Sequence, residues 1–162
     1  MKIRRYTSAD MNELVQLIIG FRNSLASLKS QETKCSPDDA KDELNSYISK
    51  GFPIYMAVDS EKIVGYIVCR IDSDVVWAES LYVIPEYRRT GVGSKLYLQA
   101  EELANEYGNE TLFNWIHPNN ETIVQFLKKQ GYNVLNLIEL RKPWSGEKPT
   151  RKIQVGKNEF DY

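Results

Sequence analysis

Two arginines followed by two closely spaced glycines form the segment of this chain best suited to chemistry, Arg88-Arg89-Thr90-Gly91-Val92-Gly93-Ser94. It lies between a predicted strand and a predicted amphipathic helix. The first backbone N–H groups of a helix have no intrahelical acceptor, and they form the positive end of the helix dipole. Glycines at 91 and 93 let a phosphate come close to these groups, and the arginines add positive charge. The segment therefore predicts a diphosphate-binding loop.

Other nucleotide-binding loops fit this segment less well. The third glycine of a dinucleotide fingerprint is missing. Gly93-Ser94-Lys95 lacks the Gly-Lys-Ser order and the upstream glycine of a P-loop. A Gly-x-Gly before a helix can also be a tight turn without any ligand, and the loop alone leaves that alternative open.

Metal chemistry and covalent hydrolysis have little support in the sequence. The chain has one histidine, His117, and two cysteines, Cys35 and Cys69. These residues cannot provide a zinc or iron–sulfur spacing, and a disulfide framework is not expected. No Gly-x-Ser-x-Gly nucleophile motif is present. We therefore expect no metal site.

Length and charge describe an ordinary globular protein. The chain has 162 residues, 42% hydrophobic and 27% charged, with a formal net charge of −1. We expect a single domain over residues 1–162, with a core over about 1–141 and a C-terminal extension over 142–162. The near-neutral charge gives no general reason to bind nucleic acid or an anionic membrane. The first residues lack the apolar run of a signal peptide, so a cytoplasmic location is expected.

The order of predicted elements indicates a mixed α/β fold. Strands are expected where apolar residues run or alternate between turn residues, and helices where they recur at three- and four-residue spacing. A strand, a helix and a further strand imply a right-handed crossover with locally parallel pairing. The expected strands are 2–6, 54–58, 63–71, 75–84, 111–116, 134–140 and a possible last one at 153–155; the expected helices begin near residues 11, 37, 94 and 121.

Two sequence blocks resemble the GNAT N-acetyltransferase superfamily. The family signature Arg/Gln-x-x-Gly-x-Gly/Ala is met by Arg88, Gly91 and Gly93, after a Leu-x-Val-x-Pro-x-Tyr pattern that begins at Leu81. Downstream, Asn120 and then the run from Phe126 to Tyr132 are similar to the family's second block. The resemblance covers roughly residues 54–140.

The resemblance implies a GNAT-like fold and acetyl-coenzyme A as the acetyl donor. The fold is a mostly antiparallel twisted sheet flanked by helices, in which a splayed parallel strand pair opens the cofactor cleft. The main chain around Leu81 and Val83 would pair with the pantetheine arm, as an added edge strand does. The implied cofactor-binding residues are Leu81, Tyr82, Val83, Arg88, Arg89, Thr90, Gly91, Val92, Gly93, Ser94, Asn120 and Phe126.

Glu79 is the candidate catalytic base. An alkylamine has a pKa of about 10.4 and must lose a proton before it can attack a thioester. In polyamine-type members of the family a glutamate stands in the context matched here by Glu79-Ser80-Leu81-Tyr82-Val83. Strand alternation predicts that Glu79, Leu81 and Val83 share one face. A surface carboxylate without a catalytic role is the alternative, and His117 is a second possible base.

The general acid has no clear candidate. The family often uses a tyrosine in the second block, and Leu127 occupies that position here. Tyr82, Tyr87 and Tyr132 are possible substitutes. Trp115 stands where N-terminal acetyltransferases of ribosomal proteins carry a glutamate, which argues against their mechanism.

The expected activity is transfer of an acetyl group from acetyl-coenzyme A to a primary amine by direct attack on the thioester. A regulatory domain that binds acyl-coenzyme A with little catalysis is the alternative. The acceptor is a small molecule or a protein N-terminus, and a homodimer is possible through the basic tail. A cationic amine would suit the acidic residues Glu32, Asp38, Asp39, Asp42 and Glu43.

Overall fold

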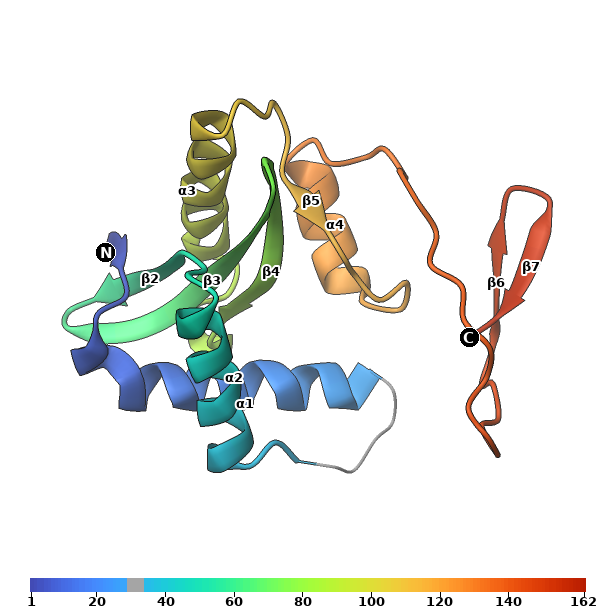
Figure 1. Ribbon diagram of the computed structural model, residues 1–162, viewed down its shortest axis with the longest axis horizontal. Helices are drawn as coiled ribbons and strands as arrows, with labels where there is room; N and C mark the ends of the chain where they lie inside the picture. Colours follow the sequence, from blue (N-terminus) through green and yellow to red (C-terminus); the bar gives the residue numbers. More distant parts are fainter. Residues whose placement is uncertain (29–33) are drawn as a thin grey trace. The chain divides into compact units, whose positions relative to one another are not determined.

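The computed structural model describes residues 1–28 and 34–162, which form two compact units, 1–131 and 132–162 (Figure 1). Glu32 and part of the expected loop between Ser24 and Lys34 lie outside the described residues. The boundary after Gly131 falls before residue 141, where the sequence predicted the end of the core. One domain over 1–162 stays a prediction.

The first unit contains a five-stranded sheet in the order β1-β2-β3-β4-β5. The pairs β1–β2, β2–β3 and β3–β4 are antiparallel, and the pair β4–β5 is parallel. This arrangement confirms the mixed α/β fold and the mostly antiparallel sheet. The strands are β1 (Lys2–Arg5), β2 (Ile54–Asp59), β3 (Lys62–Asp72), β4 (Val75–Val83) and β5 (Phe113–Asn114).

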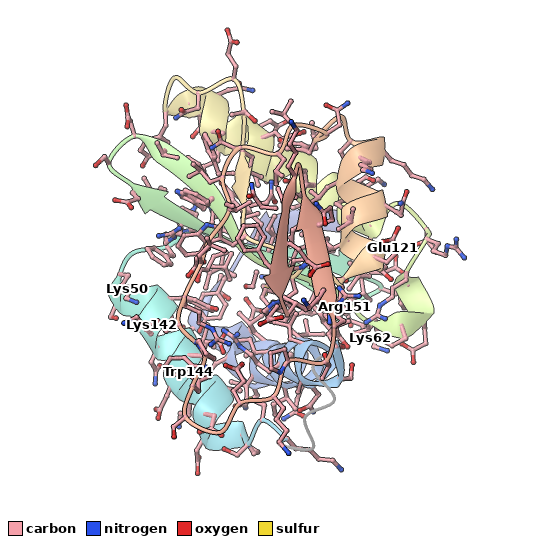
Figure 2. The ribbon with its side chains drawn as sticks, turned by 90° about the vertical axis from the view of Figure 1, so that its right-hand side faces the viewer. Lys50, Lys62, Glu121, Lys142, Trp144 and Arg151 are labelled. Carbon is pink, nitrogen blue, oxygen red and sulfur yellow. The ribbon has the colours of Figure 1, made fainter. Side chains whose placement is uncertain are left out.

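The four α-helices of the described residues begin close to where the sequence placed them. A capping box in which Ser36 and Asp39 each bond the other's backbone N–H starts α2, with Pro37 as its first residue. Asn120 caps α4, whose first residue Glu121 is labelled in Figure 2. Among the described residues, no helix combines the length and the apolar character needed to cross a bilayer. The helices are α1 (Met11–Leu28), α2 (Pro37–Ser49), α3 (Val92–Glu106) and α4 (Glu121–Lys129).

The sheet is covered on both faces. On one face, Leu14 and Ile18 of α1 and Leu44 of α2 pack with Tyr66 of β3 in a buried cluster. On the other face, α3 comes close to the strands at Gly65. A Cβ built on Gly65 would lie 2.8 Å from the carbonyl oxygen of Tyr82 and 3.3 Å from Cδ1 of Leu96. Gly65 therefore allows β3, β4 and α3 to meet without a side chain between them.

The second unit is a hairpin preceded by an extended segment. The hairpin strands are β6 (Lys152–Val155) and β7 (Asn158–Asp161), which turn at Gly156 with φ of 59°. The prediction of a strand over Val134–Leu140 was wrong, because these residues form no strand. Their large apolar side chains are 48–84% exposed. The alternating pattern identified a segment suited to a strand, but a strand also requires a hydrogen-bonded neighbour.

Candidate active site

The predicted diphosphate loop connects β4 to α3 through a short 3-10 turn, η2 (Pro85–Tyr87). Gly91 precedes the helix with φ of 89°, a left-handed conformation that glycine adopts without strain. Lys95 N–H donates to the Gly91 carbonyl at 3.1 Å, which is the first helical bond of α3. The N–H groups of Val92, Gly93 and Ser94 come before that bond. Within the described chain no side chain caps them, so they remain available to an anion.

The arginines and the threonine of the loop have different surroundings. Arg88 Nε–H donates to the Val83 carbonyl at 2.9 Å, and its guanidinium lies 5.4 Å from the centre of the Tyr82 ring. The Thr90 hydroxyl donates to the Tyr87 carbonyl at 2.7 Å. Arg89 is exposed and has a positive φ of 63°. Arg88 and Thr90 therefore brace the turn, and the charge of Arg89 faces solvent next to the open N–H groups.

Phe126 closes one side of the loop. A Cβ on Gly93 would lie 3.5 Å from Cε2 of Phe126, so the second glycine brings the backbone against this ring. The ring packs edge-on against Tyr97, with centroids 5.6 Å apart. The side chain of Asn120, predicted to contact pantetheine, accepts a hydrogen bond from Ile123 N–H at 3.4 Å. The pantetheine contact of Asn120 stays a prediction.

The parallel pair β4–β5 separates after two residue pairs. Trp77 pairs with Phe113 and Ala78 with Asn114, and no later pair forms among the described residues (Figure 1). Beyond Ala78, the edge of β4 that faces β5 is left without a neighbouring strand. The main chain of Leu81 and Val83 lies on this edge, where the resemblance placed the pantetheine arm. The predicted splayed pair is confirmed.

A β-bulge interrupts β4 at the candidate base. Val68 of β3 pairs with Ser80, and the next residue, Cys69, pairs with Ala78. Glu79 therefore has no partner on β3. A bulge of this kind turns a side chain away from the face that simple alternation would give it.

The bulge overturns the prediction that Glu79, Leu81 and Val83 share a face. Paired residues of adjacent strands share a face, and side chains alternate along each strand. Leu81 pairs with Ile67, and Val83 lies two positions further on the same side. Glu79 instead forms an ion pair with Arg70, which is on the opposite face of β3 from Ile67. The Glu79 side chain therefore does not share a face with the side chains of Leu81 and Val83. It can share a site only with the main chain of these two residues.

Glu79 belongs to a cluster that the sequence analysis did not identify. Its Oε2 lies 3.2 Å from Nε of Arg70. The Arg70 guanidinium carbon lies 4.9 Å from the Trp77 ring centre and 4.7 Å from that of Trp115. A carboxylate oxygen of Asp72 is 3.9 Å from Nη1 of Arg70. The available signal was a single arginine near the end of an otherwise apolar strand, since a half-buried charge needs partners.

The structure gives none of the three tyrosines considered from the sequence a clear role as general acid. Leu127 is 4% exposed and packs in the interior. Tyr87 donates to Asp59 at 3.3 Å, and burial followed by the charge of Asp59 raises its pKa. Tyr82 lies against α1, where a Cβ on Gly20 would come within 2.6 Å of its hydroxyl. Tyr132 belongs to the second unit. The acid stays unassigned.

Two of the acidic residues expected to attract a cationic acceptor have structural roles. Asp39 accepts hydrogen bonds from Ser36, which lower the pKa of its carboxyl group. Glu43 accepts from Arg22 Nε–H at 2.6 Å and from the Tyr47 hydroxyl. The hydrogen bond to Glu43 and the charge of that carboxylate raise the pKa of Arg22. Asp39 therefore caps the start of α2, and Glu43 links α2 to α1.

The two cysteines show no sign of reactivity, and the described residues offer no cluster of metal ligands. Cys69 is buried, and burial raises the pKa of its thiol to about 12. The pKa of Cys35 is also raised, chiefly by burial. Within residues 1–28 and 34–162, no group of three or more histidine, cysteine, aspartate or glutamate side chains lies close enough together to hold a metal ion.

Solved structures share this fold at low sequence identity. An aminoglycoside 6'-N-acetyltransferase from Acinetobacter haemolyticus is 17% identical, with 89% of this chain and 99% of that chain covered and a TM-score of 0.68. A probable acetyltransferase is 20% identical, with 91% of this chain and 100% of that chain covered and a TM-score of 0.72. The PaiA N-acetyltransferase from Thermoplasma acidophilum, in complex with coenzyme A, is 20% identical. The match covers 80% of this chain and 87% of that chain, with a TM-score of 0.65.

The sequence itself matches the model of the acetyltransferase (GNAT) family over residues 22–132. The matched range includes the glycine loop, the bulged strand and the second block. This match covers well over half of the chain, and it agrees with the separated strand pair and the open start of α3. The chain belongs to the acetyltransferase (GNAT) family.

Proposed function

We propose that this protein transfers an acetyl group from acetyl-coenzyme A to a primary amine. The observation that carries the proposal is a pair of open backbone segments at the two ends of one loop. The loop joins the unpaired edge of β4 to the uncapped N–H groups at the start of α3. One suits a diphosphate and the other suits an extended amide-containing chain. Coenzyme A has both groups.

The residues present fit this donor. The amides of Val92, Gly93 and Ser94 would hold the diphosphate, with Arg89 contributing charge. The main-chain groups of Leu81 and Val83 would bind the pantetheine arm. Acetyl-coenzyme A supplies the activated acetyl thioester. The complex of the Thermoplasma enzyme with coenzyme A supports acyl-coenzyme A as the donor class.

Glu79 is proposed as the base that makes the acceptor nucleophilic. Its carboxylate takes a proton from the ammonium group, directly or through a water molecule. The amine nitrogen then forms a bond to the thioester carbonyl carbon, the carbon–sulfur bond breaks, and the departing thiolate takes up the second proton, which the nitrogen loses as it becomes an amide. A thiol pKa of about 8.5 makes this thiolate an adequate leaving group without a dedicated acid. Buried Leu127 is therefore compatible with turnover.

Support for a small amine acceptor comes from relatives. The Acinetobacter structure is that of an enzyme that acetylates aminoglycoside antibiotics, which are small amines. A protein N-terminus remains the alternative acceptor. The expected homodimer and cytoplasmic location stay predictions.

A second candidate function is a domain that senses acyl-coenzyme A without turnover. Two observations favour it. Leu127 replaces the usual acid, and Glu79 is already held by Arg70 at 3.2 Å. Both functions predict binding of coenzyme A, but only an enzyme releases free thiol when an amine is added.

Calorimetry with acetyl-coenzyme A, followed by thiol release across a panel of primary amines, tests the proposal. Binding with amine-dependent release supports the enzyme, and binding without release supports the sensor. Failure of the wild-type protein to bind would overturn the donor assignment for both functions.

Gly93→Asp should weaken acetyl-coenzyme A binding about tenfold, because a carboxylate placed among the phosphate-binding amides repels the diphosphate. The fold should be retained. Acidic residues are favourable in the first turn of a helix, and the new Cβ meets Phe126 at an ordinary 3.5 Å. Gly93→Asn is the matched control of the same shape without the charge. Equal dissociation constants for the two variants would contradict the assigned position of the diphosphate.

A further inference from the structure

The cluster around Arg70 has features of a binding site for a cation. Two indole rings, from Trp77 and Trp115, lie within 5 Å of the same guanidinium group. The rings also contact each other, with centroids 5.1 Å apart. Glu79 and Asp72 supply negative charge beside them. The three charged groups sum to −1, so Arg70 does not fully neutralise the two carboxylates.

The cluster lies where β4 and β5 separate. Trp77 is in the first residue pair of the two strands, and Trp115 directly follows the second pair. Glu79 is the first residue of β4 beyond the pairing. All of these side chains meet at Arg70, on the face of β3 that carries Tyr66 and is covered elsewhere by α1 and α2.

Packing alone does not account for Trp115. Its side chain is 66% exposed, and the neighbouring Ile116 is 41% exposed. A tryptophan that stays mostly in water contributes little apolar burial. One part of its ring attracts Arg70, and a second part is open to solvent. An aromatic surface beside excess negative charge attracts cations through the ring quadrupole.

We propose that Trp115, with Trp77, Asp72 and Glu79, selects acceptors that carry two positive charges. This inference rests on the proposed acetyl transfer and names its acceptor class. The reacting ammonium group lies at Glu79, where it loses its proton. The second cation of the acceptor lies against the open face of Trp115 and near Asp72. The preferred substrates are therefore small diamines or polyamines rather than monoamines, which carry only one positive charge.

A pair of acceptors of equal length tests the charge requirement. 1,4-Diaminobutane carries a second ammonium group where 4-amino-1-butanol carries a hydroxyl group. We expect kcat/KM for the diamine to exceed that for the amino alcohol by about 3- to 30-fold, the range of a single cation–π contact. The same comparison is made for each diamine from 1,3-diaminopropane to 1,6-diaminohexane and the amino alcohol of equal length, so that the result does not depend on one chain length. Equal values across all pairs would overturn the inference.

Trp115→Leu and Trp115→Phe assign the preference to the ring. Leucine should make kcat/KM equal for the diamine and the amino alcohol, and phenylalanine should keep part of the preference for the diamine. Trp144→Leu is the matched control, because Trp144 is also exposed, at 70%, and its ring lies 4.9 Å from the guanidinium of Arg141 (Figure 2). The control should leave the ratio unchanged. A ratio that survives Trp115→Leu would also overturn the inference.

A binding measurement separates this inference from the proposed function. Calorimetry of 1,4-diaminobutane with the coenzyme A-saturated protein requires no turnover. Binding that weakens in Trp115→Leu supports the site even if thiol release is never seen. Conversely, thiol release with monoamines and without a preference for diamines would support the proposed acetyl transfer and contradict the proposed diamine site. Circular dichroism checks that each variant is folded.

Discussion

Glu79→Gln should lower kcat for acetyl transfer by about 10²–10⁴-fold, the usual contribution of a general base. Glutamine keeps the shape of the side chain and an oxygen that can face Arg70, but it cannot take a proton from the ammonium group. The dissociation constant of acetyl-coenzyme A should change little, because the proposed donor contacts are main-chain groups of β4 and α3. Steady-state thiol release and calorimetry measure the two quantities.

The pH dependence of this variant provides a second measurement. Without a base, the rate depends on acceptor that is already neutral in solution. That fraction rises about tenfold per pH unit below the amine pKa of about 10.4. Residual activity of Glu79→Gln should therefore rise steeply with pH. Glu147→Gln is the control, since Glu147 also pairs with an arginine, at 2.6 Å from Arg141. Wild-type turnover in Glu79→Gln would remove Glu79 from the mechanism.

Gly65→Ala should lower the free energy of unfolding by about 2 kcal/mol, within the range for overpacked interiors. The new Cβ would lie 2.8 Å from a backbone oxygen, that of Tyr82, and the paired strands cannot give way there as a flexible side chain could. It would also lie 3.2 Å from Cγ2 of Val83. The smaller gain from restricting the unfolded chain, about 0.4–1 kcal/mol, does not offset this clash. Urea unfolding gives the difference.

Gly93→Ala is the matched control for this substitution. Its Cβ would meet nothing closer than 3.5 Å, and alanine favours the helix that residue 93 occupies. This variant should be as stable as the wild type or slightly more so. Equal urea midpoints for Gly65→Ala and the wild type would show that the strands and α3 can move apart at small cost.

Much of the first unit could be predicted from local patterns. Alternation and turn residues located β2, β3 and β4, and the Ser36-Pro37 cap located the start of α2, because these signals act over a few residues. The glycine loop was recognisable for the same reason. Its backbone conformation depends on Gly91 itself, which has a φ of 89°.

The remaining features depend on pairing between distant residues. Nothing in Ala78-Glu79-Ser80 shows that Cys69 will pair with Ala78 and leave Glu79 unpaired. The approach of Arg70 to Trp115 likewise needs three strands in register. Val134–Leu140 reads as a strand, yet pairing and not pattern decides whether one forms. The alignment of separate strands was therefore the part that local sequence could not supply.

The bulge in β4 also determines how this strand tolerates changes in length. Because Ser80 and Ala78 already sit opposite consecutive residues of β3, removal of Glu79 would leave an uninterrupted ladder. A one-residue deletion usually inverts the side-chain orientation of everything beyond it. Here both flanks would keep their present orientation, and only the extra local twist would disappear. Loss of one codon at this position would thus remove the candidate base and leave the rest of the sheet in place.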